Sequence, residues 1–136
     1  MNSDEKAIAA VLAKYQHALN QSSTNEVMEL YASDGVFMPQ NSASSVGTEA
    51  VRKAYDAVFA AITLTVKFDI AEIHQVAADW AFARTNSAGR VKVHATGDSA
   101  AEGNQELFVF QKIGGDWKIA RYCFSSTNPP AVSVPN

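Results

Sequence analysis

The sequence predicts an α+β fold in which three helices precede an antiparallel sheet. Apolar residues recur at spacings of three and four up to about Ile62, which is typical of helices, and at every second position afterwards, which is typical of strands. The pair Gly114-Gly115 indicates a tight turn between two antiparallel strands. We expect residues 1–136 to form a single domain with a core over about 5–127 and an irregular tail over 128–136.

Three helices are predicted before Ile62. The first covers 4–20, where acidic residues in the first turn favour the positive end of the helix dipole. Residues 23–26 have the spacing of a capping box and predict the start of a short second helix. Thr48 is expected to cap the third helix. The residues predicted to face the core from these helices are Ile8, Leu12, Tyr15, Leu19, Val27, Leu30, Tyr31, Val51, Ala54, Tyr55, Val58 and Phe59.

Strands account for most of the remaining chain. A short strand over 36–38 is ended by Pro39, and the polar, small residues that follow predict a loop over 40–46. The longer strands are expected over 64–70, from 80 toward 93, over 106–113 and over 117–125, while the small residues of 94–104 indicate a mobile connection. A strongly twisted sheet that wraps around helices leaves a cavity, so polar side chains that face it are the functional candidates.

Composition excludes several classes of protein. The chain has 11 basic and 14 acidic residues, a net charge of −3, and the basic residues are scattered, so we expect no nucleic-acid partner. The single cysteine cannot form an intrachain disulfide, no apolar run is long enough to span a membrane, and the polar first residues lack a signal-peptide pattern. We therefore expect a cytoplasmic protein with no membrane association.

No cofactor or metal is expected either. The three histidines are far apart and have no ligand spacing, so they predict no metal site. The sequence has no glycine-rich phosphate loop that opens a helix, because Gly114-Gly115 joins two strands. This argues against nicotinamide-dependent redox chemistry.

Several short segments resemble those of a known superfamily. They are 15–20 (Tyr-Gln-His-Ala-Leu-Asn), 30–37 (Leu-Tyr-Ala-Ser-Asp-Gly-Val-Phe), 47–52 (Gly-Thr-Glu-Ala-Val-Arg), 114–119 (Gly-Gly-Asp-Trp-Lys-Ile) and 121–124 (Arg-Tyr-Cys-Phe). In order and spacing they are similar to the SnoaL-like branch of the NTF2-like superfamily, the ketosteroid isomerase-like, cystatin-like α+β cone. The last segment also resembles the SgcJ/EcaC-type members. The resemblance implies three helices packed on a strongly curved antiparallel sheet. It assigns no activity, because the superfamily includes isomerases, dehydratases, cyclases and transport factors.

The resemblance to the isomerase can be followed residue by residue. Its oxyanion hole uses a tyrosine of the first helix and a protonated carboxylic acid on a central strand, an example of pKa tuning. Tyr15 stands at the place of that tyrosine, and Glu106 at the place of the acid, as Glu rather than Asp. The isomerase's general base follows the short strand, where this chain has 38–40 (Met-Pro-Gln). None of these three side chains is a base at neutral pH, so steroid isomerisation is excluded.

Strand alternation suggests further residues that face the cavity. Glu106 shares a face with Phe108, and Trp80 and Phe82 share one with Arg84. On the last strand, Trp117, Ile119, Arg121 and Cys123 are expected to face inward, and Tyr122 and Phe124 outward. The inward set then has two arginines for one glutamate, an excess of positive charge that suits an anionic ligand. Phe37, Tyr55 and His74 complete the predicted ligand-binding residues.

Two functions stay open at this point. One is a binding module or enzyme whose cavity holds a small apolar or amphipathic ligand, anionic at its polar end. Its chemistry would be cofactor-independent proton transfer of the isomerase, cyclase or hydratase kind, with Glu106 and Tyr15 as the catalytic residues. The other is a non-catalytic homodimer, formed through the convex sheet face, in which Arg84, Glu106 and Arg121 form a satisfied ion-pair network. Tyr122 and Phe124 on that face favour a homodimer in either case.

Overall fold

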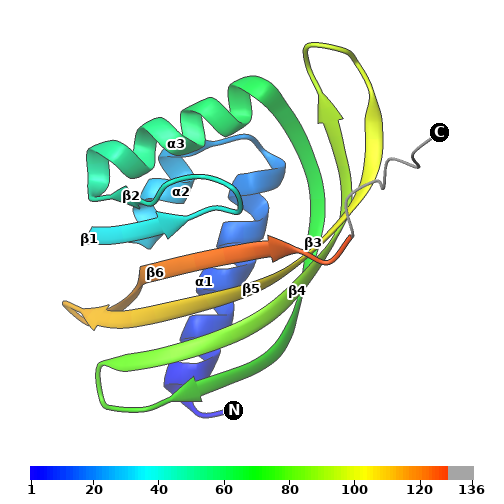
Figure 1. Cartoon of the computed structure of the whole chain (residues 1–136). Helices are drawn as coiled ribbons and strands as arrows, with labels where there is room; N and C mark the ends of the chain where they lie inside the picture. The colour runs from blue at the N-terminus through cyan, green and yellow to red at the C-terminus, as the bar shows by residue number, and fades with distance from the viewer. Residues whose placement is uncertain (129–136) are drawn as a thin grey trace.

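A computed structural model describes residues 1–128 of the chain, so most of the predicted tail lies outside the described residues (Figure 1). The α+β prediction is confirmed. The elements are α1 (Ser3–Asn20), α2 (Thr24–Leu30), β1 (Tyr31–Met38), β2 (Ser45–Val46), α3 (Thr48–Ala61), β3 (Ile62–Gln75), β4 (Trp80–Val93), β5 (Ser99–Ile113) and β6 (Asp116–Ser126). Among residues 1–128, none of the three helices combines the length and the apolar character of a membrane-spanning segment.

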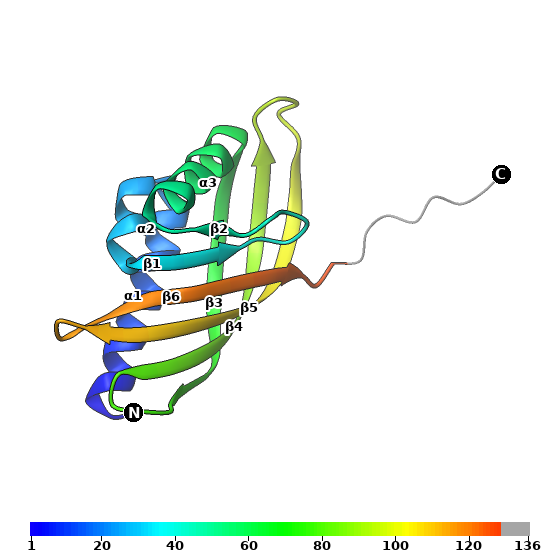
Figure 2. The ribbon, with the colours of Figure 1, turned by 60° about the vertical axis from the view of Figure 1, so that its left-hand side comes forward.

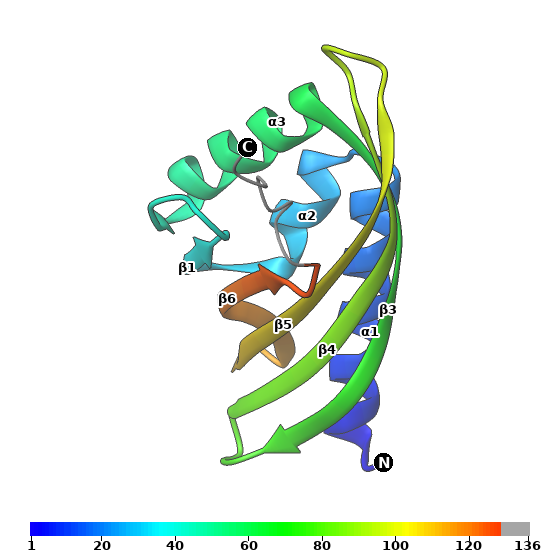
Figure 3. The ribbon, with the colours of Figure 1, turned by 45° about the vertical axis from the view of Figure 1, so that its right-hand side comes forward.

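The six strands form one curved sheet with the order β2-β1-β6-β5-β4-β3. Strands β3 to β6 make the predicted antiparallel meander, while β1 pairs in parallel with β6 and makes the sheet mixed. The helices lie together on one side of the sheet (Figure 2). Strands β3 and β4 bend along their length around α1 (Figure 3). The inner face of the sheet and the helices therefore enclose the core.

Three boundaries differ from the sequence prediction. Tyr31, expected in the second helix, has an extended backbone and begins β1. Gly47 rather than Thr48 caps α3, because the Thr48 hydroxyl donates to the Ser33 carbonyl instead. The predicted connection over 94–104 is mostly strand, since β5 already begins at Ser99. Its small residues belong to a regular ladder with β4, in which Ala101 pairs with Arg90.

Two backbone features shape the inner face of the sheet. In β6, Ile119 pairs with Phe110 and Arg121 with Val109, so Ala120 is an extra residue, a β-bulge. In β4, Gly89 lies so close to β3 that a Cβ atom there would be 1.9 Å from the Thr65 carbonyl oxygen. The bulge resets the alternation of β6, and the glycine allows close approach of two strands.

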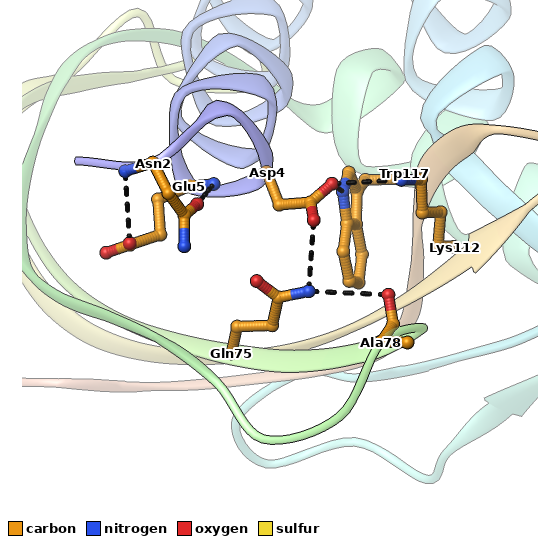
Figure 4. Close-up of polar contacts among 7 residues, drawn as sticks. All are labelled: Asn2, Asp4, Glu5, Gln75, Ala78, Lys112 and Trp117. Atoms are coloured by element: carbon orange, nitrogen blue, oxygen red, sulfur yellow. Dashed lines mark hydrogen bonds and ion pairs between the residues drawn. The ribbon is translucent and has the colours of Figure 1, made fainter.

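A polar cluster fixes the start of α1 to the sheet (Figure 4). One Asp4 carboxylate oxygen accepts hydrogen bonds from the Trp117 indole and the Lys112 ammonium, each at 3.0 Å, and the other accepts one from Gln75 at 3.1 Å. These hydrogen bonds lower the pKa of Asp4, and the bond from Trp117 contributes most to the shift. The first turn of α1 is thereby bound to β3, β5 and β6 at once.

Candidate functional site

A cavity of about 140 Å³ lies between helices α1 and α3 and the inner face of the sheet. Half-buried residues mark its opening to solvent: Pro39, Val58, Ile62, Phe68, Glu102 and Phe124. The other lining residues are buried: Tyr15, Leu19, Phe37, Tyr55, Leu64, Val66, Ser87, Asn104, Glu106 and Tyr122. The volume is close to the ~150 Å³ of an apolar cavity that binds benzene, so one small ring fits.

Three of the four tyrosines of the chain, Tyr15, Tyr55 and Tyr122, line this cavity, and the fourth, Tyr31, contacts Tyr55. The Tyr55 hydroxyl lies 2.7 Å from the Tyr15 hydroxyl and 2.7 Å from the Tyr31 hydroxyl. The Tyr122 ring packs edge-on against Tyr15, with ring centroids 5.4 Å apart. Burial raises the pKa of all four phenols, and the Glu106 charge raises it further for Tyr15 and Tyr122. The tyrosines are therefore neutral hydrogen-bonding groups at neutral pH.

Glu106 is the buried carboxyl group of the site, with 5% of the residue exposed. It faces inward from β5, opposite Thr85 of β4. The Thr85 hydroxyl donates to one carboxylate oxygen and the Ser87 hydroxyl to the other, both at 2.6 Å. Burial raises the pKa of Glu106, and the charge of Glu102 adds to the rise, while the two hydroxyls partly oppose it. A carboxylate whose pKa is raised in this way accepts a proton more readily than an exposed glutamate does.

Glu102 and Asn104 continue the polar row of β5 toward the opening. The Asn104 amide donates to Glu102 at 2.7 Å, and the alternation of β5 places both on the same face as Glu106. Within residues 1–128, no Lys, Arg or His side chain lines this cavity. The site thus combines apolar and aromatic walls with one acidic edge.

Four of the predicted site residues line the cavity, and a fifth, Phe108, faces inward without reaching it. Tyr15, Tyr55, Phe37 and Glu106 line the cavity. Phe108 faces inward and is fully buried beneath them, with its ring stacked on Tyr122 at 4.2 Å between centroids.

The prediction that the β4 residues Trp80, Phe82 and Arg84 face the cavity is wrong. Their alternation holds, but the inward residues of β4 are Ala81, Ala83, Thr85 and Ser87. The reason is packing, because Ala81 and Ala83 pair with the large Phe110 and Phe108 of β5. On the outer face, Arg84 forms an ion pair with Glu72. His74, also expected at the cavity, stacks there on Phe82 with ring centroids 5.3 Å apart.

The predicted inward position of Arg121 is wrong as well. The bulge at Ala120 reverses the alternation after Ile119, so Tyr122 and Phe124 face the cavity and Arg121 is exposed. The Arg121 guanidinium donates to the backbone carbonyls of Asp34 and Ala120. The cluster of two arginines around Glu106 does not exist, and the expected positive excess in the cavity is wrong in sign.

Sequence reasoning missed Tyr122, Ser87, Asn104 and Glu102 as cavity residues. Counting back from Glu106 in steps of two reaches Asn104 and Glu102, so alternation was a signal for them once the strand is extended. No local signal marks the bulge that turns Tyr122 inward.

The position of the isomerase's base contains no base in this structure. Pro39 lines the cavity, while the exposed Gln40 accepts a hydrogen bond from the backbone of Ser126. An amide bound in this way cannot take up a proton at neutral pH.

The fold and the site define a class of protein: an α+β cone whose aromatic cavity contains a buried carboxyl group. The sequence matches the SnoaL-like domain over residues 8–129, and the chain belongs to this family. No match was found among curated proteins.

Solved structures show the same cone. A ketosteroid isomerase-like protein from Erwinia carotovora atroseptica is 33% identical, covers 95% of this chain and 100% of its own, and has a TM-score of 0.91. A nuclear transport factor 2-like superfamily protein from Salmonella enterica serovar Typhimurium is 14% identical, with 97% and 96% covered and a TM-score of 0.80. A hexachlorocyclohexane dehydrochlorinase is 10% identical, with 98% and 94% covered and a TM-score of 0.82. The last two likenesses show the fold alone.

Proposed function

We propose that this protein binds a small, mostly apolar molecule in the cavity and that Glu106 exchanges a proton with it. The carrying observation is a carboxyl group that is 5% exposed, has no cationic partner among the described residues and lies at the polar edge of an aromatic cavity. A buried carboxyl group without a counter-charge is costly to the fold, and perturbed groups of this kind cluster at functional sites.

The surrounding groups support a division of roles. Phe37, Leu64 and Val66 would hold the apolar part of the ligand. The Thr85 and Ser87 hydroxyls fix the Glu106 carboxyl group, and Tyr15 offers a hydrogen bond to the polar end. The chemistry is cofactor-independent proton transfer of the isomerase, cyclase or hydratase kind. We also propose that the protein belongs to the SgcJ/EcaC-type members of the family and that it is cytoplasmic.

Binding can be tested with phenol as the probe, followed through amide chemical shifts. Phenol should perturb residues that line the cavity, and the cavity-filling variant Val58→Trp should abolish the effect because Val58 lies at the opening. Val46→Trp is the matched control, since Val46 is 66% exposed outside the cavity. Equal phenol binding by both variants would contradict the cavity as the binding site.

Proton transfer can be tested with cyclohexanone in deuterium oxide. The protein should accelerate exchange of the protons next to the carbonyl group, and Glu106→Gln should reduce the acceleration by roughly a hundredfold or more, the usual contribution of a general base. If phenol binds but the exchange is not accelerated, the protein is a binding module, and the proposal that Glu106 transfers a proton is refuted.

The homodimer is a second proposal, now with different residues. Tyr122 and Phe124 face the cavity and no longer support it. The outer face of the sheet instead exposes Trp80 and Leu107, at 39% and 42%, beside Phe82. We propose that a second copy covers this face, since exposed apolar patches often mark interfaces. Sedimentation should show a dimer that Leu107→Asp converts to a monomer, and a monomeric wild type would refute it.

A further inference from the structure

The charges around the cavity indicate what kind of polar end its ligand carries. The ionisable groups that line it are Glu102, Glu106 and tyrosines, and no side chain of opposite charge lines it within residues 1–128. Arg84 and Arg121, the two cations that the sequence predicts at the cavity, lie on the outer face of the sheet. There Arg84 pairs with Glu72, and Arg121 donates a hydrogen bond to the Asp34 carbonyl. An anionic ligand would meet like charges here, and a neutral one would leave the carboxylates without a counter-charge.

The two carboxyl groups have room for further donors. Each Glu106 oxygen accepts one hydroxyl hydrogen bond, and Glu102 accepts one from Asn104. A carboxylate offers about four acceptor positions, so acceptors stay open on both groups. An ammonium group brings three donors and a full positive charge, and hydrogen bonds of that kind are the strong ones.

The walls of the cavity suit the apolar part of such a ligand. Phe37 and Tyr55 are stacked with ring centroids 4.5 Å apart, and Tyr122 and Phe124 lie beside them. The cavity volume of about 140 Å³ admits one ring, with Glu102 at the opening to meet a substituent on it.

We infer that the ligand of this cavity is a small amine, protonated at neutral pH, with its nitrogen on the acidic edge that runs along β5 from Glu102 to Glu106 and its apolar part among the aromatic rings. This inference rests on the proposed function of the cavity as a ligand site. It reverses the anionic ligand that the sequence suggested, because the structure moves both arginines to the other face of the sheet.

Three probes of one shape test it by isothermal titration calorimetry at neutral pH: benzylamine, which is then a cation, benzyl alcohol and benzoate. We expect benzylamine to bind at least about tenfold more tightly than benzyl alcohol, and benzoate not to bind. Glu102→Gln should weaken benzylamine by about tenfold and leave benzyl alcohol within about twofold. Glu49→Gln is the matched control, because Glu49 is exposed on α3, away from the cavity, and pairs with Lys53.

The outcomes separate the two proposals. Benzyl alcohol or benzoate binding as tightly as benzylamine overturns the amine inference and leaves the cavity as a ligand site. Benzylamine binding that Glu102→Gln and Glu49→Gln weaken equally also overturns it, since the effect is then one of net charge. Absence of binding by all three probes, together with no effect of phenol, overturns both.

Discussion

Replacing Tyr55 by phenylalanine tests whether one hydroxyl holds the tyrosine cluster together. The Tyr55 hydroxyl lies 2.7 Å from those of Tyr15 and Tyr31, and the three residues are at most 6% exposed. Phenylalanine keeps the ring and its stacking on Phe37. The substitution therefore removes two hydrogen bonds and little packing.

The cost follows from which neighbours are left without a partner. A buried polar group without its partner costs about 1–3 kcal/mol. Tyr31 loses the hydroxyl to which it is bonded, whereas Tyr15 still has Tyr122 beside it, so we expect about 2–4 kcal/mol in total. With an unfolding entropy of about 2.1 cal/mol/K per residue, this lowers Tm by roughly 7–14 °C. Tyr31→Phe removes one hydrogen bond and leaves the Tyr55 hydroxyl bonded to Tyr15, so it should cost only about 0.5–1.5 kcal/mol.

Urea unfolding followed by circular dichroism measures the free energies, and scanning calorimetry measures Tm. The m-value should stay constant, because the surface exposed on unfolding does not change. A Tyr55→Phe variant no less stable than Tyr31→Phe would refute the central position of the Tyr55 hydroxyl.

Three further predictions concern other parts of the molecule. Burial raises the pKa of Glu106 above its ordinary 4.5, so the fold loses stability as pH rises through the raised value. Glu106→Gln should then match wild type in its free energy of unfolding near pH 4 and exceed it above neutrality by about 1.4 kcal/mol per unit of pKa rise, and an equal difference at both pH values would contradict this. Hydrogen bonds lower the pKa of Asp4 below 3.8, so wild type should lose stability in acid more steeply than Asp4→Asn, and parallel curves of Tm against pH would contradict this. Gly89→Ala should cost about 3 kcal/mol or more, because its Cβ would collide with the Thr65 carbonyl oxygen, and an unchanged midpoint of urea unfolding would contradict the close approach.

Much of the fold was predictable because helices and strands have different periods. The stripe of Ile8, Leu12, Tyr15 and Leu19 fixes which side of α1 is buried, and all four residues are in the core. The same stripe brings Tyr15 to the cavity. The acid on the central strand was placed by the resemblance to the isomerase, and strand alternation then put Glu106 on the same face as Phe108.

The arginines could not be placed because alternation tells which residues share a face and not which face is inside. We expected aromatic Trp80 and Phe82 to mark the inner face of β4, and Arg84 with them. The inner positions of a strand must instead fit the side chains beside them, and the phenylalanines of β5 leave room only for Ala81 and Ala83. That information lies in the pairing of two strands and not in either one.

The bulge at Ala120 means that β6 could lack this one residue and still direct the same side chains into the cavity. Without Ala120, Ile119 would be followed directly by Arg121, and ordinary alternation would still direct Tyr122 and Phe124 inward. Relatives with a regular last strand can thus be one residue shorter here and carry the same cavity wall. Aligning them with this chain requires a gap at Ala120. An alignment without that gap would match the exposed Arg121 to a cavity residue and assign the wrong charge to the site.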